Sequence, residues 1–363
     1  MEINKVYYGF KLEEEYEVSE IQSIARIFTH EKSGAKLLHL ENEDDNKVFS
    51  IGFRTPPSNS TGVPHIIEHC VLSGSKKYRT KEPFMDMVKG SLQTFINAMT
   101  FSDKTVYPVA SRNEKDFFNL MDVYLDAVLH PRIYEEPMIF MQEGWHHELF
   151  DEKDPVIYKG VVYNEMQGAY SSPERILGDE IDKSLYPDTC YRFSSGGKPE
   201  VIPELSYEEF LNFHKKFYHP SNSYIYLYGN GDIEKQLKFI DEEYLSEFDK
   251  MEIDSEIYIQ LPFQERKEAI AYYPILKDEP EENRSYLSLN YVLGENIDPE
   301  LYLMTNIIGL LLIDMEAAPL KKALIEAEIG EDIFSMTTGG IQPGFSIVAK
   351  NSSMDKKEEF ERV

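Results

Sequence analysis

The chain has 363 residues, of which 42% are hydrophobic and 13% aromatic, enough apolar material for packed cores in about two domains. It carries 37 Lys and Arg residues against 65 Asp and Glu residues, a formal net charge of −28. This balance argues against nucleic-acid binding, which depends on basic side chains that neutralise phosphates. It favours cationic partners such as basic peptides, although an acidic surface that serves only solubility explains the same composition.

The N-terminus and the cysteines bear on cellular location. Residues 1–5 lack the basic start and apolar run of a signal peptide. Cys70 and Cys190 make no disulfide framework and suit a reducing compartment. The longest apolar run, residues 307–313, is too short to cross a bilayer. We therefore expect a cytoplasmic location and no membrane partner.

The first regular elements are strands. Residues 25–30, 35–40 and 47–55 are rich in β-branched and aromatic side chains and are separated by turn residues. This pattern predicts an antiparallel meander. A loop over residues 56–62 then leads into a short helix.

That helix begins near Pro64 and stops before Gly74. His65, Glu68 and His69 fall on one face at helical spacing. The opposite face carries Ile66, Ile67, Cys70 and Val71. Two His residues four apart can bind one Zn²⁺, and the Glu before the second His can accept a proton from the attacking water, as in the inverzincins. The alternative is a solvated helix face with two surface His residues. Because Cys70 lies on the apolar face, we expect its thiol to be buried and inert.

The next segment places two strands close to this motif. Residues 82–89 have helical spacing, and residues 91–100 and 104–110 have strand character. Two adjacent strands could expose an edge that adds a substrate strand, although both could equally be core strands. Residues 113–129 predict an amphipathic helix with an aromatic stripe in the core.

Two later segments offer further metal ligands. His146 and His147 have no second His four residues away, so we do not expect them to bind metal. Residues 159–170 predict a helix in which Glu165 lies among apolar neighbours. Because a buried carboxylate is costly unless it is paired or bound to metal, Glu165 is a candidate third ligand, with water in the fourth position.

Five stretches resemble the pitrilysin-type metallopeptidases, in particular the branch that contains presequence protease and falcilysin. They are residues 61–69, 91–100, 106–111, 142–146 and 160–166. The resemblance implies one Zn²⁺ per chain, bound by His65, His69 and Glu165, with Glu68 as the general base. It also implies an edge strand that pairs with the substrate backbone, formed by Phe95, Ile96, Asn97 and Ala98.

The resemblance further implies an α+β fold, a duplicated roll of antiparallel sheet backed by helices. Residues 1–256 would form the catalytic zinc-binding domain and residues 257–363 a second, non-catalytic copy that is incomplete. In this second copy the pattern predicts strands at 258–262, 269–273 and 286–293 and helices at 300–314 and 319–328. Members of this branch are far longer, and their C-terminal half supplies an Arg and a Tyr near the scissile bond.

The resulting function is a zinc-dependent endopeptidase that cleaves unfolded, basic peptides. The expected partner is the C-terminal half of the same protein. Three alternatives stay open, namely a catalytically incomplete fragment, a module that binds a peptide strand at Asn97 without cutting it, and a structural subunit of a larger complex. A structural subunit typically has a broken motif, whereas all four motif residues are present here.

Overall fold

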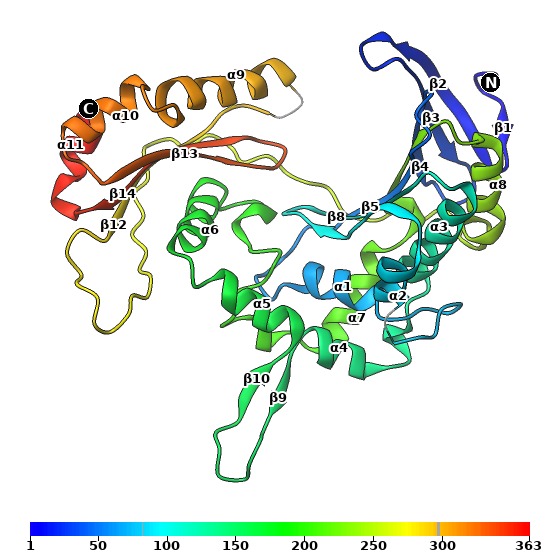
Figure 1. The fold of residues 1–363 in the computed structure, drawn as a ribbon, viewed down its shortest axis with the longest axis horizontal. Coiled ribbons are helices and arrows are strands. Elements are labelled where there is room, and N and C mark those ends of the chain that lie inside the picture. The colour runs from blue at the N-terminus through cyan, green and yellow to red at the C-terminus, as the bar shows by residue number, and fades with distance from the viewer. Residues whose placement is uncertain (82, 296–297) are drawn as a thin grey trace. The chain divides into compact units, whose positions relative to one another are not determined.

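A computed structural model describes residues 1–81, 83–295 and 298–363 (Figure 1). The chain forms two compact units. Unit 1 comprises Met1–Gln167 and Ser195–Glu256, and unit 2 comprises Gly168–Ser194 and Ile257–Val363. Each unit combines antiparallel strand pairs with helices, so the predicted α+β class is confirmed.

Unit 1 is built on a mixed sheet. Among the described residues, nine strands form it in the order β1-β2-β3-β4-β11-β5-β8-β6, and β7 pairs with β8 off this path. The strands are β1 (Val6–Tyr7), β2 (Phe10–Val18), β3 (Ser23–His30), β4 (Lys36–Glu41), β5 (Lys47–Arg54), β6 (Gln93–Ile96), β7 (Met99–Thr100), β8 (Lys104–Ser111) and β11 (Ser223–Gly229).

The predicted antiparallel meander is only partly right. β3 and β4 pair antiparallel as expected, but β4 and β5 are not neighbours. β11 lies between them, parallel to β4 and antiparallel to β5. Its alternating sequence buries Ile225 and Leu227 and exposes Tyr224, which is the pattern of a strand with one face on a core.

Helices complete unit 1. They are α1 (Val63–Val71), α2 (Pro83–Gly90), α3 (Glu114–Leu129), α4 (Pro137–Glu143), α5 (Val161–Ala169), α7 (Tyr207–Phe217) and α8 (Ile233–Glu243). The side chain of Asn113 caps α3 by accepting a hydrogen bond from the Asp116 amide. The predicted core face of α3 is buried and packs on β5 and β8. The helix predicted for 82–89 corresponds to α2, and its first predicted residue, Glu82, lies outside the described residues.

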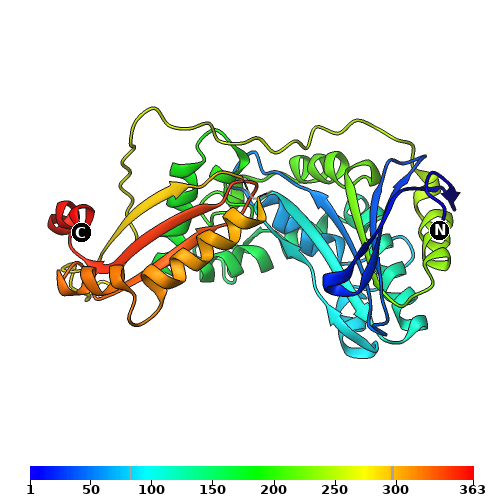
Figure 2. The same cartoon turned by 90° about the horizontal axis from the view of Figure 1, so that it is seen from above.

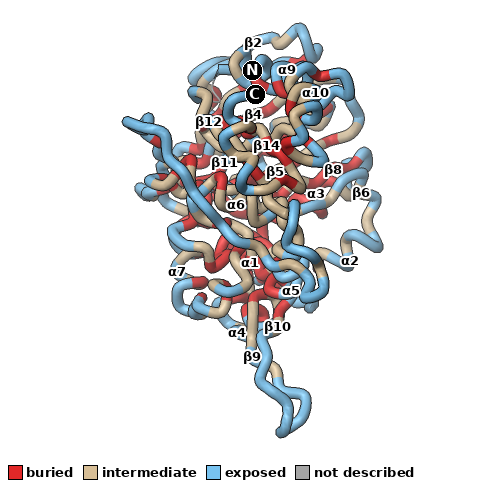
Figure 3. The backbone as a smooth tube through the Cα atoms, turned by 90° about the vertical axis from the view of Figure 1, so that its left-hand side faces the viewer, coloured by how far each residue is buried: buried red, intermediate tan, exposed pale blue. Residues whose placement is uncertain are grey.

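A hairpin of β9 (His146–Glu148) and β10 (Ile157–Lys159) projects from α4 and α5 (Figure 3). Its tip is exposed, and Phe150 there is 69% accessible. At its base, the rings of Trp145, His147 and Tyr158 contact one another. These contacts stabilise the hairpin where it leaves the body of unit 1.

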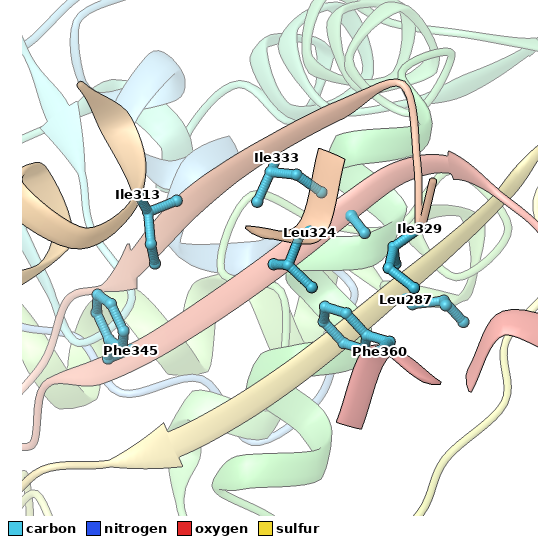
Figure 4. Close-up of a cluster of buried hydrophobic side chains, with 8 residues drawn as sticks. Leu287, Ile313, Leu324, Ile329, Ile333, Phe345 and Phe360 are labelled. Carbon is cyan, nitrogen blue, oxygen red and sulfur yellow. The ribbon is translucent and has the colours of Figure 1, made fainter. Parts of the chain in front are cut away.

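Unit 2 has a three-stranded antiparallel sheet, in the order β12-β14-β13, among its described residues. Its elements are α6 (Pro173–Leu185), β12 (Ser285–Val292), α9 (Pro299–Gly309), a π-helical turn (Leu310–Asp314), α10 (Pro319–Glu326), β13 (Asp332–Thr338), β14 (Gly344–Ser352) and α11 (Lys357–Arg362). The helices α10 and α11 and the π-helical turn share a buried cluster with the sheet (Figure 4), formed by Leu287, Ile313, Leu324, Ile329, Ile333, Phe345, Ala349 and Phe360.

Two of the strands predicted for the second copy are wrong. Residues 258–262 and 269–273 form no strand. Tyr258, Leu261, Ile270 and Tyr272 are all more than 60% exposed. Alternation of apolar and polar side chains produces a strand only where a sheet provides a partner and a core, and neither is found here in the described part of the chain.

The predicted division of the chain after residue 256 also differs from the contacts within the molecule. Gly168–Ser194, which the prediction placed in the first domain, groups with unit 2. The reason is a second buried cluster, in which Ile181 and Tyr186 pack against Val292 and Met336 of unit 2. The roles expected for the two domains stay predictions.

The helices predicted at 300–314 and 319–328 are confirmed, the first as α9 continued by the π-helical turn and the second as α10. Pro299–Glu326 passes the length and hydropathy criteria for a membrane span, with 22% of its most apolar window buried. It is not one uninterrupted helix, because the π-helical turn ends at Asp314 and α10 begins at Pro319. In Figure 2 this stretch lies along β13 and β14. Core helices of globular proteins meet the same criteria but are mostly buried, whereas most of this window is exposed.

Candidate metal centre

The motif helix α1 forms where the sequence predicts it. Gly62 precedes it with a φ of 72°, and Pro64 occupies its first turn. Ile66 and Ile67 are fully buried, and α1 packs on α4 and α7. The apolar face therefore anchors the helix, which ends at Val71, before the predicted stop.

The other face of α1 meets α5 at a cluster of possible metal ligands. His65, His69 and Glu165 each offer one ligand atom, and these atoms lie within 4.8 Å of one another. Nε2 of His65 and Nε2 of His69 are each 3.7 Å from Oε2 of Glu165. The structure thus brings together the three predicted ligands from two helices.

These distances fit a zinc ion. Ligands at 2.0–2.1 Å in tetrahedral geometry lie about 3.3–3.4 Å apart, close to the observed 3.7 Å. Two imidazoles and one carboxylate form one of the donor sets of catalytic zinc sites, which keep a fourth position open. Among the described residues, this is the one group of His, Cys, Asp and Glu side chains close enough to hold a metal ion.

The ring of His65 is oriented by a backbone carbonyl. Its Nδ1 lies 3.2 Å from the carbonyl oxygen of Gly196, which fixes the tautomer that leaves Nε2 free for a metal. The loop approaches so closely because Gly62 lacks a side chain. A Cβ on Gly62 would lie 2.6 Å from the same carbonyl oxygen, and the positive φ there also favours glycine.

A carboxylate orients the ring of His69. Nδ1 of His69 lies 3.5 Å from Oε2 of Glu143, at the end of α4, and the Glu143 side chain is only 13% exposed. Burial lowers the pKa of His69, but the hydrogen bond to Glu143 and the neighbouring carboxylates outweigh it and raise the pKa above 6.5. Glu143 is a contact that the sequence pattern missed.

The candidate base Glu68 is buried, with 8% of the residue exposed. Its Oε2 accepts a hydrogen bond of 2.6 Å from Oγ1 of Thr100 on β7. Sequence reasoning placed Thr100 in a strand near the motif but gave it no role. Thr100 is thirty-two positions from Glu68 in the sequence, so the contact of its hydroxyl with the Glu68 carboxylate could be found only from the fold.

Glu165 lies at the site, but the predicted burial of its carboxylate is wrong. The prediction took Glu165 as a buried carboxylate among apolar neighbours, whereas its side chain is 55% exposed. Val162 and Met166 face the core, and Glu165 projects from the opposite part of α5. An exposed carboxylate at this position remains open to an incoming ion.

The candidate substrate edge lies at the end of the unit 1 sheet. Within the described ranges, β6 pairs only with β8, so its other side is an open edge. Phe95 and Ile96 belong to β6, whereas Asn97 and Ala98 connect β6 to β7. The Asn97 amide donates to the Pro108 carbonyl, and Tyr124 Oη donates to the Asn97 carbonyl at 3.1 Å, which holds the end of the strand in place.

The remaining candidates stay apart from this cluster. His146 points Nδ1 at the Met141 carbonyl, and His147 packs in the hairpin base. Cys70 is fully buried, as predicted, and burial raises the pKa of its thiol well above the usual value. Neither imidazole nor thiol joins the metal cluster.

Comparison with protein families matches most of the chain. Residues 48–186 match the model described as "Insulinase (Peptidase family M16)", and residues 204–361 match "Peptidase M16 inactive domain". The first match contains the three candidate ligands and Glu68.

Individual proteins are also similar to this chain. Protein HypA of Clostridium perfringens is 57% identical over 363 residues, covering 99% of this chain and 37% of that protein. Presequence protease 1, chloroplastic/mitochondrial, of Arabidopsis thaliana is 43% identical over 360 residues, covering 98% of this chain and 33% of that protein. The crystal structure of pitrilysin matches with a TM-score of 0.62 at 15% identity, over 97% of this chain and 36% of that one, which concerns the fold alone. The chain thus spans about a third of the length of these curated relatives.

Proposed function

Because the chain belongs to the M16 (insulinase, pitrilysin-type) peptidase family, we propose that it is a zinc-dependent endopeptidase for unfolded peptides. The observation that carries this proposal is the cluster of His65, His69 and Glu165 with Glu68 on the same helix face. These three ligands would hold one Zn²⁺ per chain. When bound, the ion polarises the scissile carbonyl and acidifies the attacking water.

The residues of the chain perform the other parts of the reaction. Glu68 accepts the proton that the attacking water loses and delivers it to the nitrogen of the leaving amine. Its burial keeps bulk water from competing for the carboxylate. The contacts of His65 with Gly196 and of His69 with Glu143 keep both rings oriented with Nε2 toward Glu165.

The open edge of β6 supports a substrate in extended conformation. A peptide that pairs with Phe95, Ile96, Asn97 and Ala98 would be held by its backbone, so its sequence would matter little. Folded proteins cannot offer a free strand at this edge, which favours unfolded substrates. The net charge of −28 favours basic peptides, and nucleic acid and membrane are not expected partners.

The proposed protein partner is the C-terminal half of the same protein, since the chain spans only about a third of the length of its curated relatives. A catalytically incomplete fragment, a peptide-binding module and a structural subunit are the alternatives. The cytoplasmic location stays a prediction, since one relative is named as chloroplastic/mitochondrial.

The decisive experiment measures cleavage of a quenched, basic, unstructured peptide by the zinc-loaded 363-residue chain and by Glu68→Gln. We expect cleavage by the unmodified chain only, with one zinc bound to each protein. Equal cleavage by the two proteins would refute the role of Glu68. One bound zinc without any cleavage would favour the incomplete fragment or the peptide-binding module.

A second comparison tests the ligand set. Glu165→Ala should lose zinc, because it removes one of three ligands. Glu148→Ala on β9 is the matched control and should retain zinc, since Glu148 contacts His146 and Lys159 rather than the cluster. Equal retention by both variants would exclude Glu165 as a ligand.

A further inference from the structure

We infer that Thr100 is a positioning residue for Glu68, a role that rests on the proposed function. The starting point is the burial of the Glu68 carboxylate. A buried charge needs hydrogen bonds to replace those of water. Within the described part of the chain, the bond from Oγ1 of Thr100 is the one that this carboxylate receives.

The backbone of Thr100 is held rigidly. Thr100 pairs with Thr105 across the β7–β8 ladder, and the Phe101 amide donates to the Lys104 carbonyl in the connecting turn. The hydroxyl of Thr105 is in turn hydrogen-bonded to Thr55 at 2.8 Å, and both side chains are fully buried. The donor to Glu68 therefore comes from an ordered strand and not from a mobile loop.

This geometry gives the two carboxylate oxygens of Glu68 different roles. Oε2 of Glu68 is occupied by the Thr100 hydroxyl, which at 2.6 Å is a short, charge-assisted hydrogen bond. Oε1 is then the oxygen that exchanges a proton with the reacting groups. Because the bond fixes the rotation of the carboxylate, it determines where Oε1 points.

The strand that carries Thr100 also connects the base to the candidate substrate edge. β6 and β7 both pair with β8, and only Asn97 and Ala98 separate them. The same ladder therefore sets the position of the substrate backbone and the orientation of Glu68. When a substrate binds at β6, the carboxylate of Glu68 is already held in one orientation, so the site is preorganised for catalysis.

The first test uses Thr100→Val, which keeps the shape and removes the hydroxyl, and Thr100→Ser, which keeps the hydroxyl. In the zinc-loaded chain, we expect kcat to fall about 10²-fold in Thr100→Val with KM and zinc stoichiometry unchanged, as for a misplaced catalytic group. Thr100→Ser should retain most of kcat. Thr29→Val on β3, outside the site, is the matched control. Wild-type kcat in Thr100→Val, equal loss in Thr100→Ser, or loss of zinc would each overturn the inference.

A second test does not depend on activity. A double-mutant cycle of Thr100→Val and Glu68→Ala is measured on unfolding of the metal-free protein, followed by fluorescence of Trp145, the chain's one tryptophan. A hydrogen bond to a charged group predicts a coupling of about tenfold or more in the unfolding equilibrium constant. Coupling below twofold overturns the inference. If the unmodified chain cleaves nothing, the proposed function fails, and the cycle still decides whether Thr100 holds Glu68.

Discussion

Replacing Glu143 should weaken zinc binding although Glu143 is not a ligand. Its carboxylate lies 3.5 Å from Nδ1 of His69 and is only 13% exposed, so water can replace it poorly. Loss of such an outer partner typically costs 10–100-fold in metal affinity, about 1.4–2.8 kcal/mol. Glu143→Gln keeps the volume and an acceptor oxygen and loses only the charge, so we expect about tenfold. Glu143→Ala also loses the acceptor and should approach a hundredfold.

The assay is competition for zinc with a chromophoric chelator at neutral pH. Glu148→Gln is the matched control, because Glu148 lies on β9 and pairs with His146 and Lys159. It should bind zinc with unchanged affinity. If Glu143→Gln and Glu143→Ala both bind zinc as tightly as the unmodified chain, Glu143 does not orient His69 and the reasoning is wrong.

Three further predictions concern stability. Burial lowers the pKa of His39 to about 4, so the unfolded chain takes up a proton below pH 6.5 before the folded chain does. The contribution of His39 to the free energy of unfolding should be full above pH 6.5 and should be lost as the pH falls toward 4. Urea denaturation should therefore find a smaller decrease in the free energy of unfolding over this range for His39→Gln than for the unmodified chain; an equal decrease would contradict this. Leu324→Ala should cost unit 2 about 2–5 kcal/mol by hydrogen exchange, whereas the exposed Lys322→Ala should cost little, and similar values for the two would refute the packing argument. Gly62→Ala should cost at least about 1–2 kcal/mol because of its positive φ, and more because the added Cβ would clash with the Gly196 carbonyl; it should also weaken zinc binding. Gly90→Ala, whose Cβ would contact nothing, is the control, and equal thermal shifts for the two variants would contradict the prediction.

Local patterns predicted the parts of the fold that depend on local geometry. On a helix, the spacing of His65, Glu68 and His69 places all three side chains on one face. The apolar residues on the opposite face indicate which side of the helix is buried. The core face of α3 followed from its periodicity in the same way. The approach of Glu165 to this helix was implied by family resemblance, and the physical reason offered for it, burial, does not hold.

Features that depend on pairing between distant segments could not be predicted. Nothing near residues 42–46 indicates that β11 inserts between β4 and β5. The contacts of Thr100 and Glu143 with the motif join separate elements, and no spacing rule relates them. Conversely, alternation alone predicted strands near residues 258–273 where the described chain provides no partner strand.

The central place of β11 has a consequence for how unit 1 is made. As the chain leaves the ribosome, β1–β4 and β5–β8 emerge long before residues 223–229, which join them into one sheet. Until then, β4 and β5 each present an unpaired edge with buried-type side chains such as Leu37 and Phe49. Closure of the sheet across so long a separation is slow. The nascent chain therefore passes through a period in which two open half-sheets are vulnerable to aggregation, and in which a chaperone that covers strand edges would raise the yield of folded protein.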